Sequence, residues 1–104
     1  MEVERIKYER TGGFAGMRIA TDFKPEDLPE EQVHALLNLL DEMDFDELPE
    51  NLISDSPMPD QFTYQITVET KKGKHTVSAG DSSAPEKLQE LFRLLDRIAR
   101  RRKQ

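Results

Sequence analysis

Residues 62–79 read FTYQITVETKKGKHTVSA, and this stretch decides the fold. In its first half apolar side chains alternate strictly with polar ones, a period of two that is typical of a half-buried antiparallel strand. The run KKGK then turns the chain, and His75, Val77 and Ala79 return on one face. We therefore predict a hairpin with one face on the core. The other face of its first strand, with Thr63, Gln65, Thr67 and Glu69, should be exposed to water.

A second hairpin is predicted near the start of the chain. Residues 3–10 and 16–22 each show strand-like alternation, and the run GGFAG at 12–16 separates them. Glycine readily adopts the positive φ that a chain reversal needs, so we interpret this run as a tight or bulged turn.

One amphipathic helix is predicted after each hairpin. Asp27 is the expected N-cap of the first helix, and Glu30 completes its capping box. Ser83 and Glu86 form the expected capping box of the second helix. Apolar residues recur at helical spacing in both predicted helices, namely Val33, Leu36, Leu37, Leu40 and Met43, and then Leu88, Leu91, Phe92, Leu95 and Ile98.

The resulting order is ββαββα, which predicts an α+β fold of two layers. The two hairpins combine into one four-stranded antiparallel sheet, and both amphipathic helices cover one face of it. A chain of 104 residues suits one domain, which we place at residues 1–99, followed by a basic C-terminal tail at 100–104.

Composition and charge exclude several classes of protein. Between Pro25 and Thr70 there are thirteen acidic residues and no Lys or Arg. The pI of about 4.9 argues against a nucleic-acid-binding protein. No apolar run approaches the roughly 20 residues that span a bilayer, so we expect no membrane segment. The chain has no cysteine, which excludes disulfides and thiolate metal sites and favours a cytoplasmic protein.

No residue pattern predicts catalysis or a bound cofactor. His34 and His75 lack the spacing of a zinc site, and the acidic residues at 41–47 lack the glycine of a calcium loop. The glycine run at 12–16 joins two strands, whereas phosphate cradles open a helix. We therefore expect no enzyme activity, no metal and no cofactor. Acids near a helix C-terminus are unfavourable, so we expect either a functional role for them or a compensating base from the last helix, such as Arg97.

Two loops carry apolar side chains whose burial is open. Phe14 lies among glycines, where it either folds back over the core edge or anchors a partner protein. Met58 lies between Pro57 and Pro59 and poses the same question. The two prolines stiffen their loop, which lowers the ordering cost of binding.

The chain resembles the emfourin family along nearly its whole length. No single piece is diagnostic, and the GGFAG run is the most specific. The family usually has a second Phe after Asp44-Phe45, where this chain has Asp46. The positions that carry the resemblance are Gly12-Gly13-Phe14-Ala15-Gly16 with Arg18-Ile19, Asp44-Phe45 with Leu48-Pro49, Pro59-Asp60 before Phe62 and Tyr64, His75-Thr76-Val77, Asp81, and Ala84-Pro85.

This resemblance implies a small cytoplasmic inhibitor of thermolysin-like (protealysin-like) metallopeptidases. We expect the protein itself to be a monomer. Such an inhibitor blocks the active-site cleft without a covalent bond, and the zinc belongs to the peptidase. We expect the contact residues to be Gly12, Gly13, Phe14, Ala15, Gly16, Met58, Pro59 and Asp60. The alternative is a non-enzymatic interaction module that uses the open sheet face or the acidic helix to bind a basic partner.

Overall fold

The computed structural model describes residues 3–12, 17–52, 62–80 and 84–101. Within these residues the strands are β1 (Val3–Gly12), β2 (Met17–Phe23), β3 (Asn51–Leu52), β4 (Phe62–Thr70) and β5 (Gly73–Gly80). The helices are α1 (Glu30–Glu42) and α2 (Glu86–Arg101), with short 3-10 turns η1 (Pro25–Asp27) and η2 (Phe45–Glu47) on either side of α1. The α+β class with two helices is confirmed.

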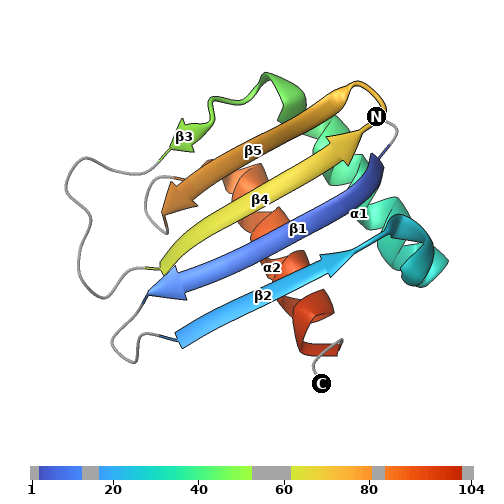
Figure 1. The fold of residues 1–104 in the computed structure, drawn as a ribbon, viewed down its shortest axis with the longest axis horizontal. Coiled ribbons are helices and arrows are strands. Elements are labelled where there is room, and N and C mark those ends of the chain that lie inside the picture. Colours follow the sequence, from blue (N-terminus) through green and yellow to red (C-terminus); the bar gives the residue numbers. More distant parts are fainter. Residues whose placement is uncertain (1–2, 13–16, 53–61, 81–83, 102–104) are drawn as a thin grey trace.

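The described strands form one sheet in the order β2-β1-β4-β5-β3 (Figure 1). Both predicted hairpins are present, and they join through antiparallel pairing of β1 with β4, which places Tyr8 opposite Ile66. The prediction of four strands, all antiparallel, is wrong. β3 adds a fifth strand parallel to β5, with Leu52 opposite Ala79. A strand of two residues is too short to show a period of two in the sequence.

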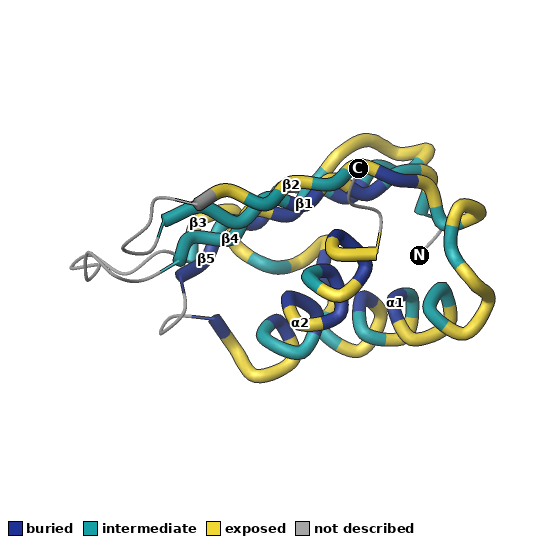
Figure 2. The backbone as a smooth tube through the Cα atoms, turned by 90° about the horizontal axis from the view of Figure 1, so that it is seen from below, coloured by how far each residue is buried: buried dark blue, intermediate teal, exposed yellow. Residues whose placement is uncertain are grey.

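Both helices cover the same face of the sheet, as predicted (Figure 2). The amphipathic stripes point toward the strands, and the other face of the sheet carries no helix within the described chain. The core lies between these two layers. Its largest fully buried side chains are Tyr8, Phe23, Phe45, Ile6, Leu36, Leu40, Ile66, Leu88, Leu91, Leu95, Ile98 and Val68.

The starts of the helices differ in detail from the prediction. Asp27 does not cap α1: its Oδ2 accepts a hydrogen bond of 3.0 Å from the backbone N–H of Lys24, which closes η1 instead. The α-helix begins at Glu30, after Pro29. Ser83, the other predicted cap, lies outside the described residues. Because α2 runs through Arg101, the predicted basic tail begins within this helix, where cations suit the helix dipole.

Candidate functional site

The strand ends at one side of the sheet lie next to one another. Gly12 is paired with both Met17 and Phe62, Thr63 is opposite Gly80, and Leu52 is opposite Ala79. We call this side of the sheet its loop end, and it is at the left in Figure 1. The described residues that form it are Gly12, Met17, Leu52, Phe62 and Gly80.

The predicted contact residues relate to the loop end in two ways. Gly12 belongs to it and has a φ of 105°, which residues with a side chain rarely adopt. Gly13, Phe14, Ala15, Gly16, Met58, Pro59 and Asp60 lie outside the described residues. Their two segments, 13–16 and 53–61, are bordered by strand residues of this same end, because β1, β2, β3 and β4 all contribute to it.

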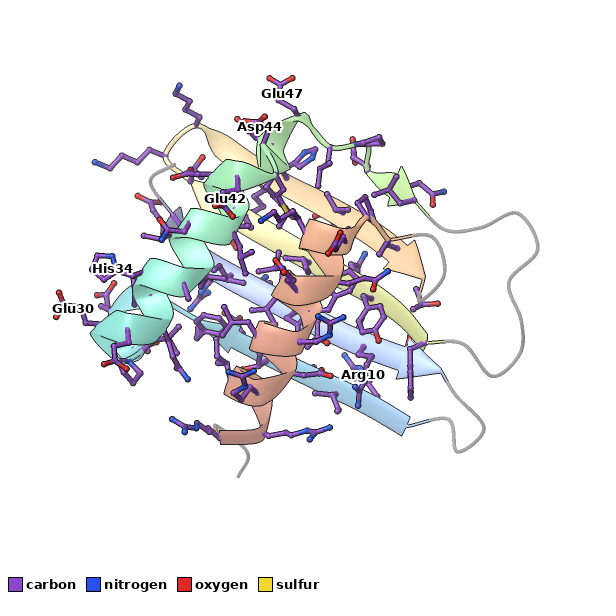
Figure 3. All side chains as sticks on the ribbon, turned by 180° about the vertical axis from the view of Figure 1, so that it is seen from behind. Arg10, Glu30, His34, Glu42, Asp44 and Glu47 are labelled. Carbon is purple, nitrogen blue, oxygen red and sulfur yellow. The ribbon has the colours of Figure 1, made fainter. Side chains whose placement is uncertain are left out.

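A charged side chain lies on the core face of β1 near the loop end. Arg10 forms an ion pair with Asp96 of α2, with 2.5 Å between Nη1 and Oδ2. The hydroxyl of Tyr8 donates a hydrogen bond of 2.5 Å to the other oxygen of the same carboxylate. The guanidinium of Arg10 also lies 4.6 Å from the ring centre of Phe62. We call Tyr8, Arg10, Phe62 and Asp96 the Arg10 cluster, and Figure 3 labels Arg10.

Stacked aromatic rings continue the Arg10 cluster toward α2. Tyr64 of β4 stacks on Phe92 of α2 with ring centres 4.1 Å apart and planes 11° from parallel. Next to them is a small hollow of about 170 Å³ that Gln89 and Arg93 also line. Aromatic and arginine side chains of this kind are enriched among the residues that dominate protein interfaces. The candidate site therefore combines the loop end with the part of α2 that carries Gln89, Phe92, Arg93 and Asp96.

Arg10 and Asp96 are not among the residues expected from the sequence to form a site. A signal was present, because Arg10 follows Ile6 and Tyr8 at the inward-facing positions of a strand with period two. Asp96 likewise lies four residues after Phe92, on the inward stripe of the last helix. Charged residues at inward positions on two separate elements are candidates for a mutual ion pair.

Burial and a hydrogen bond perturb the titration of Tyr8. Its side chain is 1% exposed. Burial first, and then the hydrogen bond to Asp96, raise the pKa of Tyr8 well above its ordinary value of 10.0. In the unfolded chain the hydroxyl of Tyr8 loses its proton near pH 10. In the folded chain the hydroxyl is still protonated at that pH.

We expect this difference to lower stability at alkaline pH. Above pH 10 the unfolded state binds fewer protons than the folded state, so the free energy of unfolding falls as pH rises, by up to about 1.4 kcal/mol per pH unit. Urea unfolding of the wild type and Tyr8→Phe at pH 8.5, 10 and 11 measures this fall. The variant should lose less stability over this range, and equal losses would contradict the assignment.

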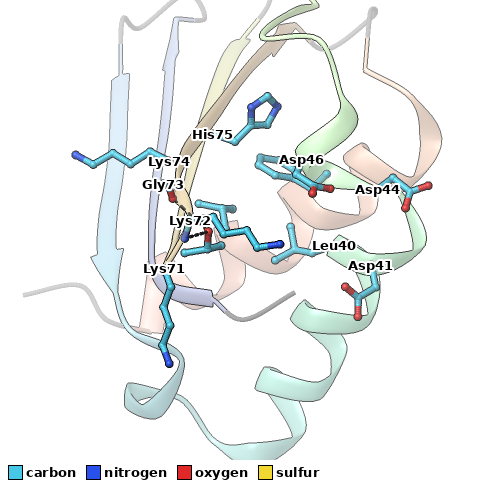
Figure 4. A pocket seen from close by; sticks show the side chains of 12 residues that line it. Leu40, Asp41, Asp44, Asp46, Lys71, Lys72, Gly73, Lys74 and His75 are labelled. Carbon is cyan, nitrogen blue, oxygen red and sulfur yellow. Dashed lines mark hydrogen bonds between the residues drawn. The ribbon is translucent and has the colours of Figure 1, made fainter.

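A larger pocket of about 790 Å³ lies at the other end of the sheet (Figure 4). Buried Leu40, Phe45 and Val68 line it. Most of the other residues that line it are charged: acids from α1 and the segment after it, and lysines from the turn between β4 and β5. These charged residues are Asp41, Asp44, Asp46, Lys71, Lys72 and Lys74. The pocket is thus separate from the loop end.

The acidic side of the molecule is built on α1 and η2. Exposed acids extend from Glu30 to Glu47, and in Figure 3 these two residues lie far from Arg10. The predicted compensating base is present but is not Arg97. Lys87 of α2 bonds Glu42, with 3.1 Å between Nζ and Oε1, and this bond raises the pKa of Lys87.

The open face of the sheet is neutralised by its own charges. Arg5 of β1 pairs with Asp22 of β2 at 3.1 Å, and Lys7 pairs with Glu69 of β4 at 4.0 Å. Arg18 and Glu9 form a third pair on this face. Since each of these charges has an opposite charge beside it, the face presents little net charge to a partner.

Among the residues that the structure describes, neither histidine lies in a group of side chains that could hold a metal ion. Nε2 of His75 lies 2.8 Å from the carbonyl oxygen of Leu48, and its ring packs edge-on against Phe45. His34 is exposed and lies 3.7 Å from Glu30 on the same helix. Across the part of the chain that the structure describes, no three His, Asp or Glu side chains are placed to hold a metal ion. No helix within that part is long and apolar enough to cross a membrane.

Comparison with known proteins connects these elements to one family. The Emfourin family model matches residues 8–96 of the chain. Among solved structures the chain is similar to emfourin from Serratia proteamaculans, described as an M4 family peptidase inhibitor, with 18% identity over 88% of each chain and a TM-score of 0.48. No curated protein matches the chain. The matched residues begin at Tyr8 and end at Asp96, so they include all of α1 and α2 as far as Asp96.

Proposed function

Since the chain belongs to the emfourin family, we propose that it is a protein inhibitor of thermolysin-like (protealysin-like) metallopeptidases. The match of the family model over residues 8–96 carries this proposal. A member of this family acts by binding the peptidase and has no catalytic activity of its own. The peptidase supplies the zinc, and the inhibitor blocks its cleft without a covalent bond.

We propose the loop end as the surface that contacts the peptidase. Its contact residues are those expected from the sequence: Gly12, Gly13, Phe14, Ala15, Gly16, Met58, Pro59 and Asp60. The arrangement of the strand ends supports a single contiguous surface, because Gly12 lies opposite both Met17 and Phe62. The segments 13–16 and 53–61 therefore leave the sheet at the same end.

We also propose that the protein acts as a monomer in the cytoplasm. The chain contains no cysteine, so its stability does not depend on an oxidising compartment. The proposal does not involve nucleic acid or membranes.

An interaction module that uses the open sheet face is the less favoured function. The charges of Arg5, Lys7 and Arg18 on that face are each paired with a neighbouring acid. A basic partner would have to compete with these pairs. The exposed acids of α1 give their side of the molecule a negative surface, but its attraction for a basic partner would act mainly on the rate of association.

Titration of a peptidase with this protein tests the proposed function. A protealysin-like metallopeptidase is held at a fixed concentration while cleavage of a short peptide is followed. We expect its activity to fall to near zero at about one equivalent, with the added chain shown to be uncut by mass spectrometry. A serine peptidase titrated in parallel should keep its activity. Full metallopeptidase activity at a large excess, or digestion of the added chain, would contradict the function.

A further inference from the structure

Arg10 occupies a position that strand periodicity reserves for the core. Ile6 and Tyr8 precede it on the same face of β1, and each is 1% exposed. The side chain of Arg10 is itself only 14% exposed, and that of its partner Asp96 only 19%. A charge in such a place requires compensation from its neighbours.

The compensation comes from two other elements, α2 and β4. Asp96 of α2 gives one carboxylate oxygen to Arg10 and the other to the hydroxyl of Tyr8, both at 2.5 Å. Because both oxygens are engaged, the carboxylate has a fixed orientation. The ring of Phe62 at the start of β4 lies 4.6 Å from the guanidinium carbon, within the range of a cation–π contact.

These contacts fasten the loop end to the helical layer. Arg10 lies two residues before Gly12, the last residue of β1, and Phe62 is the first residue of β4. Gly12 and Phe62 are themselves opposite each other in the sheet. One guanidinium thus holds the ends of two neighbouring strands to α2.

We propose that Arg10 is a positioning residue for peptidase inhibition. The proposal rests on the function proposed above and deepens it. By fixing the ends of β1 and β4 against α2, Arg10 presents the loop end to the peptidase in one arrangement. A surface that is ordered before binding loses less conformational entropy when the complex forms, so the affinity is higher. We expect this higher affinity to appear mainly as slower dissociation of the complex.

Arg10→Met tests this role, because methionine keeps much of the apolar stem and removes the charge. We expect at least tenfold weaker inhibition, with most of the change in the dissociation rate. Arg10→Lys keeps a charge near Asp96 but loses the planar guanidinium, so its effect should be smaller. Arg5→Met is the matched control, since Arg5 also lies on β1 and is ion-paired, but on the open face away from the loop end. It should inhibit like the wild type.

Two further measurements separate positioning from a general loss of stability. Val68→Ala removes buried volume near the far end of β4 and should lower stability without weakening inhibition. Amide hydrogen exchange of the free proteins should be faster at Thr11, Gly12 and Thr63 in Arg10→Met, and unchanged at these residues in Arg5→Met.

The outcomes distinguish this proposal from the proposed function. A wild-type chain that does not inhibit the peptidase would overturn the proposed function and this proposal with it. A wild-type chain that inhibits, with Arg10→Met equally potent or no faster in exchange at the loop end, would overturn the positioning role alone. Equal weakening by Val68→Ala and Arg10→Met would also overturn it.

Discussion

Phe45→Ala is expected to lower the free energy of unfolding by about 3–5 kcal/mol, the range for truncating a buried aromatic ring. Phe45 is 0% exposed and lies in η2, directly after α1. Its ring meets that of His75 edge-on, with 5.6 Å between centres, and so joins the helical layer to β5. The substitution would leave a cavity beside the open pocket at this end of the sheet.

Urea unfolding followed by circular dichroism measures this loss. Phe45→Leu is the graded control, because leucine refills much of the space and should cost less than half as much. Asp46→Ala, at the exposed neighbouring position, should change the stability little. A loss below about 1 kcal/mol for Phe45→Ala would show that the ring does not anchor this part of the core.

Phe14→Ala is expected to weaken inhibition of the metallopeptidase at least thirtyfold, about 2 kcal/mol of binding free energy. The reason is that aromatic side chains that enter a partner's pocket contribute a disproportionate share of interface energy. Gly12, two residues earlier, lies at the loop end of the sheet. Inhibition constants for the wild type and the variant, measured with the same peptidase, test this directly.

Phe14→Leu provides the matched control for this variant. Leucine retains an apolar side chain of similar reach, so its inhibition should stay within about fivefold of the wild type if an apolar pocket receives residue 14. Both variants should unfold at the wild-type urea concentration. Phe14→Ala with wild-type inhibition and an intact fold would remove Phe14 from the contact surface.

The hairpin of β4 and β5 was predictable because its alternation continues over most of two strands. Period two tells which side chains share a face, and Ile66, Val68 and Val77 are indeed buried. The partner of a strand in the sheet is not encoded in that pattern. The order of the strands, and the parallel addition of Asn51–Leu52 beside β5, therefore came only from the structure.

The sequence led us to propose two loops as the contact surface, but it did not indicate which side chains support their ends. Glycines and prolines mark turns locally, so the segments around Phe14 and Met58 could be recognised from neighbouring residues alone. The pair of Arg10 and Asp96 joins residues 86 positions apart. A charged residue at an inward-facing position indicates that an opposite charge lies nearby. The sequence contains many acids that could pair with Arg10, and only the packing of α2 on the sheet selects Asp96.

The central pairing of β1 with β4 also has a consequence for how the chain acquires its shape. Each hairpin is local and can form within about 1–10 μs, whereas β1 and β4 lie far apart in the sequence. Their docking has to close a long intervening segment and should therefore limit the folding rate. During synthesis, Arg10 emerges long before its counter-ion on the last helix. The inhibitor should thus become competent only after α2 has left the ribosome.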